Sequence, residues 1–435
     1  MADMKTEAKR ERLRSIDCVT VFVLAAAITL RNIDFPLGKD LLAGLAILLV
    51  LIDLLCHQDL RINAFTKLLI LYGLVYLSLG VAMPLLASGN EHFASEAFLA
   101  HYPFRIRLEV LRIAFVVMLA LYLGSRTESK LRGIINVSVL LALSVTAIQL
   151  LFPGLMAEMG SGIPNPGFRL SLAQQEPSAA VPFWIVMTCG FVATRRRRSL
   201  SSWLVAVSFI LIGFLTGSKA YVVALAVALP IYTVIKRDKW SIGALAMVVA
   251  IGIALYAFWA SFSHQVDVLI RFLRVFRQHG LQGLSYEYLV FDSFIIRVGS
   301  FAISVFLFAR YPFGVGFEGL RGLAGPAADT LGLTSPVVQP YTDSPVLSAK
   351  AFLPQHLVET GLIGTMLLGA IIWRVYRSLR AIGDRPMRAF LVSGFVAFCV
   401  SMMLVELFVF VIGLVLLYYV GTTTGRRSQS DGSRS

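Results

Sequence analysis

A segment rich in proline and glycine, residues 161–178 (SGIPNPGFRLSLAQQEPS), carries an arginine and a glutamate whose side chains suit group transfer. The planar guanidinium of Arg169 has the geometry to bind a diphosphate through two parallel hydrogen bonds. The carboxylate of Glu176 could accept a proton from a sugar hydroxyl. Two simpler interpretations stay open. Arg169 is then a surface loop charge, and Glu176 is a charge favoured by the dipole of a helix that starts near Pro177.

A second group of basic residues lies in the stretch 268–278, VLIRFLRVFRQ. Its leucines and phenylalanines recur at helical spacing, and its arginines fall largely on another face, which is typical of a helix lying at a membrane surface. These arginines either anchor the helix to lipid phosphates or guide an anionic headgroup toward a site. They are Arg271, Arg274 and Arg277.

Further candidates are Arg297, Arg310, Lys350, Lys219 and His356. The sequence TGSK places Lys219 in a tight turn between two apolar segments, where a lysine either snorkels to the interface or contacts a substrate. His356 lies near the start of another apolar segment. It is either a structural residue or an acid–base group.

The sequence lacks the signatures of several other chemistries. It has no GxxxxGK[ST] phosphate loop and no HExxH zinc motif, so we expect no ATP site, no metal site and no cofactor. The cysteines lie in or beside apolar runs with no C-x-x-C spacing, which predicts neither a metal site nor a disulfide framework. They are Cys18, Cys56, Cys189 and Cys399.

The elements that must position these residues are transmembrane helices. Of the 435 residues, 57% are hydrophobic and only 15% are charged, whereas soluble domains are about a quarter charged. The net charge of +14 does not indicate nucleic acid, because the basic residues form short clusters between long apolar runs. Such clusters set membrane topology. The composition therefore predicts an all-α polytopic membrane protein with a single domain spanning 1–435.

Apolar runs long enough to cross a bilayer recur along the chain. The basic cluster from Lys5 to Arg14 places the N-terminus in the cytoplasm and precedes what we interpret as a retained first helix, not a cleaved signal peptide. Nine spans then place each basic loop on the cytoplasmic side, as the positive-inside rule requires. The expected spans are 16–33, 37–55, 64–87, 108–124, 133–152, 178–194, 200–216, 220–235 and 241–262.

The rest of the chain contains the remaining spans and one large loop. The apolar stretch 298–309 is bounded by Arg297 and Arg310 and is too short to span, so we expect a re-entrant or surface helix within a periplasmic loop, 263–353. A tenth span follows at 354–373. The run 389–420 suits two short helices that break near Glu406. The total is about twelve spans, with both termini cytoplasmic.

The order and spacing of several motifs resemble those of the O-antigen ligase and O-antigen polymerase superfamily of bacterial polysaccharide assembly. The resemblance covers most of the second half of the chain, and it includes the large loop between the ninth and tenth spans. The motifs are FRLSLAQQEPS at 168–178, TGSKA at 216–220, Arg297 ahead of YPFGVGFEG at 311–319, and LVETGLIG at 357–364.

The resemblance implies an undecaprenyl-diphosphate-linked glycan as donor and metal-independent chemistry in the inner membrane. The acceptor hydroxyl attacks the anomeric carbon and the lipid diphosphate leaves, so cations aimed at the diphosphate would stabilise the transition state. Arg169 and Arg297 match positions where the family keeps basic residues, and Lys219 stands where the family more often has arginine. Membrane lipids are the other expected partners, and a protein that regulates chain length would be a further one.

Three functions remain to be separated. The ligases resemble one another in a histidine about eleven residues before the glycine of the E-x-G-x-x-G motif. Counting back from Gly361 reaches Lys350, and His356 is only five residues away, which favours a polymerase over a ligase. The phrase QEPS also resembles the polymerases. A transporter or flippase is the alternative from another class, and it would place charges and broken helices near the bilayer midplane.

Overall fold

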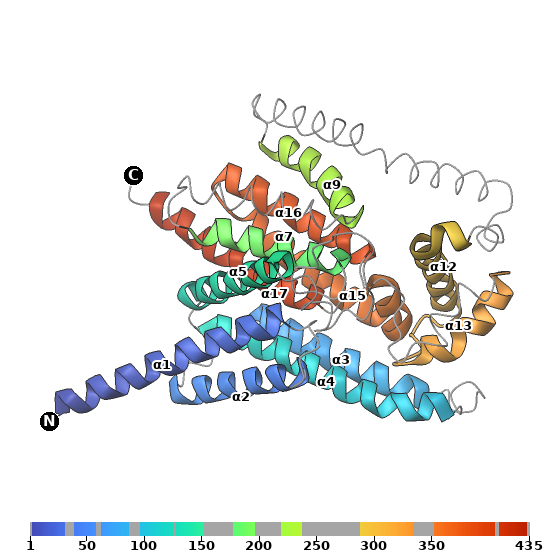
Figure 1. Cartoon of the computed structure of the whole chain (residues 1–435), viewed down its shortest axis with the longest axis horizontal. Coiled ribbons are helices and arrows are strands. Elements are labelled where there is room, and N and C mark those ends of the chain that lie inside the picture. The colour runs from blue at the N-terminus through green and yellow to red at the C-terminus, as the bar shows by residue number, and fades with distance from the viewer. Residues whose placement is uncertain are drawn as a thin grey trace.

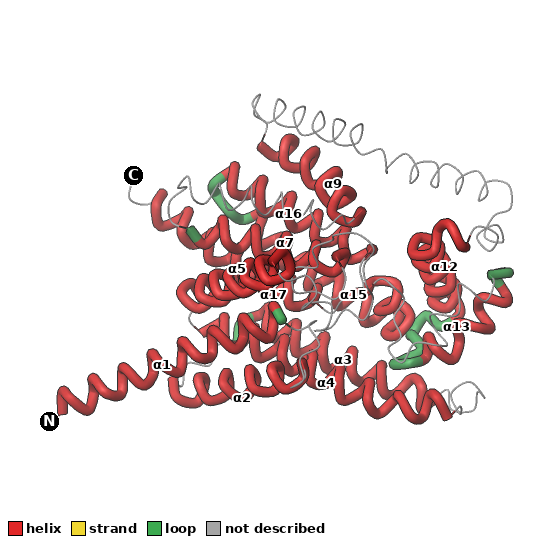
Figure 2. Tube along the Cα trace, viewed as in Figure 1, coloured by secondary structure: helices red, strands yellow, loops and turns green. Residues whose placement is uncertain are grey.

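The computed structural model describes ten stretches of the chain, and all regular structure in them is helical (Figure 1, Figure 2). This confirms the all-α class for the described part of the chain. The stretches are residues 2–30, 39–57, 62–86, 96–125, 127–151, 177–195, 219–236, 288–333, 352–404 and 409–432.

Most of the helices follow the apolar runs of the sequence. They extend beyond these runs at many ends, because polar flanking residues continue the helical backbone. In chain order they are α1 (Ala2–Thr29), α2 (Lys39–His57), α3 (Ala64–Leu86), α4 (Glu96–Ser125), α5 (Thr127–Leu151), α7 (Pro177–Thr194), α9 (Lys219–Lys236), α12 (Tyr288–Arg310), α13 (Gly319–Thr330), α15 (Phe352–Arg380), α16 (Arg385–Leu404) and α17 (Val409–Gly432).

Three helices are long and apolar enough to cross a membrane, judged on the described residues. They are Ala64–Leu86 in α3, Glu128–Ile148 in α5 and Leu353–Arg380 in α15. These helices indicate a membrane protein, as the composition predicts. The number of about twelve spans stays a prediction, because the expected spans 200–216 and 241–262 lie outside the described residues.

Two expectations about the second half of the chain can be compared with the helices. The run 389–420 is divided between α16 and α17, so the expected pair of helices is confirmed, although both are longer than the run suggested. The apolar stretch 298–309 belongs to the longer α12. This helix begins at Tyr288 and includes Arg297, which the sequence analysis took as the boundary of the apolar stretch. The periplasmic placement of this region stays a prediction.

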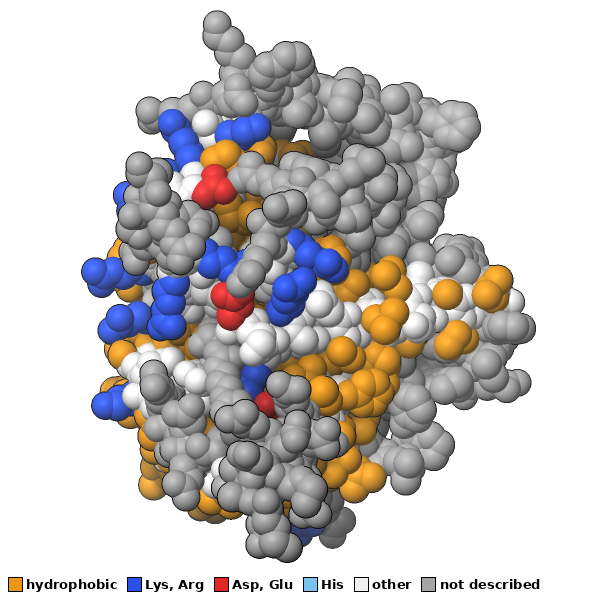
Figure 3. All heavy atoms as spheres, turned by 90° about the vertical axis from the view of Figure 1, so that its left-hand side faces the viewer, with side chains coloured by type: hydrophobic (Ala, Val, Ile, Leu, Met, Phe, Trp, Pro, Cys, Tyr) orange, Lys and Arg blue, Asp and Glu red, His pale blue; other side chains and the backbone are white. Residues whose placement is uncertain are grey.

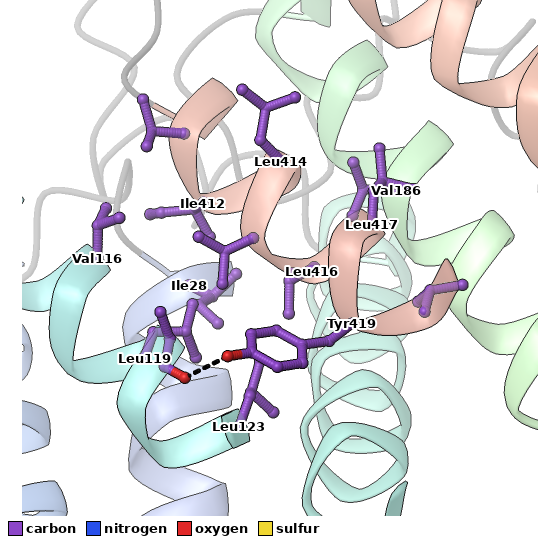
Figure 4. Packing of buried hydrophobic residues seen from close by; sticks show 14 of the residues in the cluster. Ile28, Val116, Leu119, Leu123, Val186, Ile412, Leu414, Leu416, Leu417 and Tyr419 are labelled. Atoms are coloured by element: carbon purple, nitrogen blue, oxygen red, sulfur yellow. Dashed lines mark hydrogen bonds between the residues drawn. The ribbon is translucent and has the colours of Figure 1, made fainter. Parts of the chain in front are cut away.

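The core lies around α17, which packs against α15, α7, α5 and α4. Buried aliphatic side chains of α17 meet those of α4, α1 and α7 in the view of Figure 4. The hydroxyl of Tyr419 donates a hydrogen bond of 2.7 Å to the carbonyl of Ala120 in this apolar surrounding. A central helix that is apolar on all sides is expected where every face meets another helix.

The two ends of the bundle differ. The start of α1 and the end of α17 lie at the left of Figure 1, and α12 and α13 lie at the right. Figure 3 views the left-hand side, where Lys and Arg side chains gather over part of the face. The exposed arginines in the described residues include Arg195 directly after α7, Arg374, Arg377 and Arg380 in the last two turns of α15, and Arg385 at the start of α16.

Candidate functional site

The loop between α12 and α13, residues 311–318, lies against the N-terminal part of α15. We call it the junction loop. It belongs to the motif YPFGVGFEG, and the part of α15 that it contacts belongs to the motif LVETGLIG. The backbone N–H of Val315 donates to the carbonyl of Val358 at 2.8 Å, and that of Gly316 donates to the carbonyl of Glu359 at 3.0 Å. Two motifs far apart in the sequence therefore meet through their backbones.

This contact exists because α15 is broken at Gly361, where φ is 61° and ψ is −153°. In an unbroken helix the N–H of Leu362 would donate to the carbonyl of Val358. Here Leu362 donates instead to the carbonyl of Pro312 at 2.8 Å, and Val315 takes its place at Val358. The junction loop thus replaces the hydrogen bonds that the break removes. A side chain at position 361 would meet the backbone of residues 312–314, so the site requires glycine.

The same loop completes a second interrupted helix, α3. Pro84 lies inside α3 and has no N–H to donate to the carbonyl of Gly80. That carbonyl accepts a hydrogen bond of 2.9 Å from the N–H of Phe317. Gly316, with φ of 74°, lies against the ring of Pro84, and a side chain there would clash with the ring. The loop is therefore fixed to α3 and α15 together.

The loop ends at Glu318, a buried residue with φ of 60° directly before α13. It is the one non-glycine residue with positive φ in the described part of the chain. Holding a non-glycine residue in this conformation costs on the order of 1 kcal/mol, and such strain gathers at functional sites. The strained residue lies at the point where both motifs converge.

Buried charges surround the contact between the loop and α15. Arg105 of α4 places its Nε 3.2 Å from Glu109 and its Nη2 3.4 Å from Glu359. The side-chain amide of Gln355 donates to the same carboxylate of Glu359 at 2.8 Å. Glu359 is thus held by its side chain and, through Gly316, by its backbone carbonyl. An ion removed from water costs several kcal/mol unless it is paired, which accounts for this pairing.

Glu109 is fully buried and also contacts Arg112 and Tyr76. Arg112 lies 2.5 Å from it, and the hydroxyl of Tyr76 on α3 donates to it at 3.2 Å. Arg105, Glu109 and Arg112 follow one another at spacings of four and three residues, so they share one face of α4. This face joins α4 to α3 and to α15.

Aromatic rings fill the space next to these charges. His356 lies beside Tyr72 and Tyr76, with ring centroids 5.6 Å away in each case. Phe317 of the junction loop lies 5.0 Å from Tyr76. His356 is 1% exposed, and its Nε2 is 3.3 Å from the hydroxyl of Thr360. These contacts are compatible with a structural role of His356, and its acid–base role stays a prediction.

The other predicted site residues are only partly placed. Arg297 lies in α12, three residues before the buried Ser300 and seven before the buried Ser304, so its position shares their helix face. Lys219 is the first residue of α9. Arg310 is exposed and ends α12, directly before the junction loop. Outside the described residues lie Arg169, Glu176, Arg271, Arg274, Arg277 and Lys350.

The sequence analysis did not predict the buried network of Arg105, Glu109, Arg112 and Glu359. The expected span 108–124 begins after Arg105, so that arginine lies outside the expected spans, and Glu359 enters only as part of the motif LVETGLIG. A usable signal exists in the spacing of the three charges on α4, because charges aligned on one face of an apolar helix mark an interior-facing surface. No local pattern pairs Arg105 with Glu359.

The buried charges and rings around the junction loop hold structure in place and do not by themselves form a substrate-binding site. The charges are paired with each other, and the rings are buried, so they are suited to hold the junction loop and the ends of α12 and α13 in fixed positions. Comparison with known protein families and with curated protein sequences finds no match to this chain.

Proposed function

We propose that this chain is a membrane glycosyltransferase that polymerises oligosaccharide repeat units carried on undecaprenyl diphosphate. The observation that carries the proposal is the backbone contact between the junction loop and α15, at Val315–Val358 and Gly316–Glu359. Both segments belong to motifs that resemble the O-antigen polymerases and ligases. Motifs far apart in sequence that contact one another are expected to share one role.

In the proposed reaction, a hydroxyl of the acceptor repeat unit attacks the anomeric carbon of the donor. The bond between that carbon and the diphosphate oxygen breaks, and the electron pair stays on the diphosphate. Arg169 and Arg297, with Lys219, stabilise the developing charge, which is the largest electrostatic need of such a step. Glu176 accepts the proton of the attacking hydroxyl. Arg271, Arg274, Arg277 and Arg310 guide the anionic lipid toward the site.

The orientation that fits this reaction places the arginine-rich end of the bundle in the cytoplasm, as the positive-inside rule predicts. The junction loop lies toward the opposite end, with α12 and α13 (Figure 1). In this orientation it faces the periplasm, where lipid-linked repeat units are joined. The inner membrane of a bacterium is the location that this proposal requires.

Two alternative functions remain to be tested. A ligase that transfers glycan to lipid A-core would share the motifs, but Lys350 stands where the ligases resemble one another in a histidine. A transporter is favoured by the break of α15 at Gly361 and by the buried charges on α4, because broken helices and interior charges are typical of transport sites. These buried charges were not anticipated from the sequence.

The three functions can be separated in cells that lack the gene, complemented with wild type, Arg169→Ala or Arg297→Ala. The measurement is glycan length on gels, with the lipopolysaccharide fraction separated from free polysaccharide. We expect wild type to restore long polymer and both variants to leave single repeat units. Long polymer that accumulates on the carrier lipid without the gene would indicate a ligase. Unchanged polymer in all strains would exclude both enzymes and favour a transporter.

The matched control is Arg380→Ala, an exposed arginine at the C-terminal end of α15. It removes the same charge from a helix that contributes to the junction, but at the opposite end of that helix. We expect wild-type polymer length from this variant. If it also abolished polymer, the effect of Arg297→Ala would reflect the general loss of an arginine and would not support a role at the diphosphate.

A further inference from the structure

The side chain of Arg105 connects α4 to the part of α15 that binds the junction loop. α3 packs on both α4 and α15, and Arg105 reaches from α4 to Glu359 on α15. Its Nε pairs with Glu109 on α4, and its Nη2 pairs with Glu359 on α15. A guanidinium can serve two carboxylates at once because its nitrogens form a rigid fork. Arg105 therefore links α4 to α15 through two ion pairs made by one side chain.

The residue that Arg105 pairs with on α15 is the one that binds the junction loop. The carbonyl of Glu359 accepts the N–H of Gly316, and the neighbouring carbonyl of Val358 accepts the N–H of Val315. Both carbonyls lie just before the break at Gly361, so they lack the support of a continuous helix. The side chain of Glu359 is held by Arg105 and Gln355, and this holds its backbone in place.

The junction loop in turn sets where α12 ends. Arg310 is the last residue of α12, and the loop begins at Tyr311. The loop is bonded to α15 at Val358 and to α3 at Gly80, which fixes the end of the helix that carries Arg297. A displacement of this loop would shift α12 along with it.

We infer that Arg105 is a positioning residue for the transfer reaction: its ion pair with Glu359 fixes the junction loop and so the placement of α12 with Arg297. This inference rests on the proposed glycosyltransferase function. Arg105 touches neither donor nor acceptor in this role. It acts through Glu359, Gly316 and the end of α12.

The test uses Arg105→Lys in the full chain, reconstituted in lipid nanodiscs. Lysine keeps the charge but replaces the rigid planar fork with a single ammonium on a flexible stem, so the two contacts that separate guanidinium nitrogens make to Glu109 and Glu359 are not reproduced. The matched control is Arg107→Lys, at an exposed arginine two positions along the same helix. A second control is Asp53→Asn, which breaks a buried ion pair with Lys130 and calibrates the effect of general destabilisation.

The first measurement is amide hydrogen exchange of residues 312–318, which requires no activity. We expect exchange to be at least about tenfold faster in Arg105→Lys, because the hydrogen bonds of Val315 and Gly316 open more often. Arg107→Lys and Asp53→Asn are expected to match wild type in this segment. Unchanged exchange in Arg105→Lys would overturn the inference, whatever the activity of the variant.

The second measurement is the steady-state rate of chain extension with an undecaprenyl-diphosphate-linked repeat unit. Misplacement of a reacting group by about 1 Å costs roughly a hundredfold in rate, so we expect kcat of Arg105→Lys to fall about ten- to hundredfold while KM stays within about twofold. Equal kcat in Arg105→Lys and wild type would overturn the positioning role. So would an equal fall of kcat in Asp53→Asn per folded protein, since that would indicate a merely structural effect.

Failure of the proposed function gives a different result. Wild type would then transfer no glycan from the lipid diphosphate, whereas the exchange of residues 312–318 would still depend on Arg105. In that case the glycosyltransferase proposal is wrong and the role of Arg105 in transfer falls with it. The mechanical link from Arg105 to the junction loop would stand on the exchange data alone.

Discussion

The ammonium of Lys130 lies 2.6 Å from the carboxylate of Asp53, and both side chains are at most 5% exposed. Asp17 lies 3.5 Å from the same ammonium, and the ring of Tyr122 lies beneath it at 3.7 Å. The pair joins α2 to α5, and Asp17 adds α1. This buried cluster lies on different helices from the network around Arg105, apart from the α4 residue Tyr122.

Breaking this pair should destabilise the bundle. In Asp53→Asn the charge of Lys130 stays buried without its closest partner, which typically costs about 3–5 kcal/mol. We expect a lower thermal unfolding temperature in detergent, measured by tryptophan fluorescence. Asp40→Asn, at an exposed position of the same helix, should change it little. Replacing both partners, as Asp53→Leu with Lys130→Met, should recover most of the loss, and failure to recover would show that the pair contributes more than charge balance.

The break in α15 should tolerate no side chain. Gly361→Ala forces a Cβ against the backbone of the junction loop at a positive φ, so we expect little folded protein in the membrane fraction. Gly369→Ala is the matched control, because its position on the same helix has open space around it. That change should raise stability by up to about 1 kcal/mol, since alanine is the better helix former. Normal amounts of stable Gly361→Ala protein would contradict the tight contact described here.

The start of α9 gives a test of the diphosphate proposal. Lys219→Arg should keep chain extension near the wild-type rate, because it preserves the charge and adds a planar fork. Lys219→Ala should reduce the rate about tenfold or more if the side chain stabilises the leaving diphosphate. The control is Lys236→Ala, at the other end of the same helix, where the ammonium lies over the ring of Tyr232. Equal rates in all three variants would remove Lys219 from the site.

Tyr419 should matter through its hydroxyl. That group donates to the carbonyl of Ala120, accepts from the amide of Asn63 at 3.0 Å, and lies 3.4 Å from the hydroxyl of Thr66. Tyr419→Phe leaves buried polar groups without this partner, which costs about 1–3 kcal/mol. The neighbouring Tyr418→Phe keeps its ring stacked on Phe65 at 3.8 Å and should change stability by less than about 0.5 kcal/mol. Equal effects of the two changes in thermal unfolding would contradict this prediction.

Much of the helical architecture could be predicted, because lipid selects long apolar runs that are visible in a single sequence. The division of 389–420 into α16 and α17 followed from length and from the basic residues beyond it. The extent of α12 did not, because Arg297 interrupts the apolar run without interrupting the helix. Hydropathy marks the apolar part of a helix and not its ends.

The site was predicted only in part. The motifs that contain Gly316 and Gly361 resemble motifs of one superfamily. Nothing in their local sequence pattern predicts that their backbones form hydrogen bonds with each other. The link from Arg105 to Glu359 is a long-range pairing and has no sequence signal of its own. The hydrogen bond to the carbonyl of Gly80 is also unpredictable from the sequence. Pro84 shows that this carbonyl lacks its donor within the helix, but it does not show that the N–H of Phe317 is the replacement.

The missing donor at Pro84 has a consequence for how the protein is made. α3 is synthesised long before the junction loop, so the carbonyl of Gly80 enters the membrane without the N–H of Phe317. An unsatisfied carbonyl in hydrocarbon costs several kcal/mol, so we expect water or another helix to donate to it until Phe317 has been synthesised. The carbonyls of Val358 and Glu359 then emerge after the loop that will bond them. The hydrogen bonding of α3 is therefore complete only after Phe317 has been synthesised, and we expect chains truncated before this residue to be degraded.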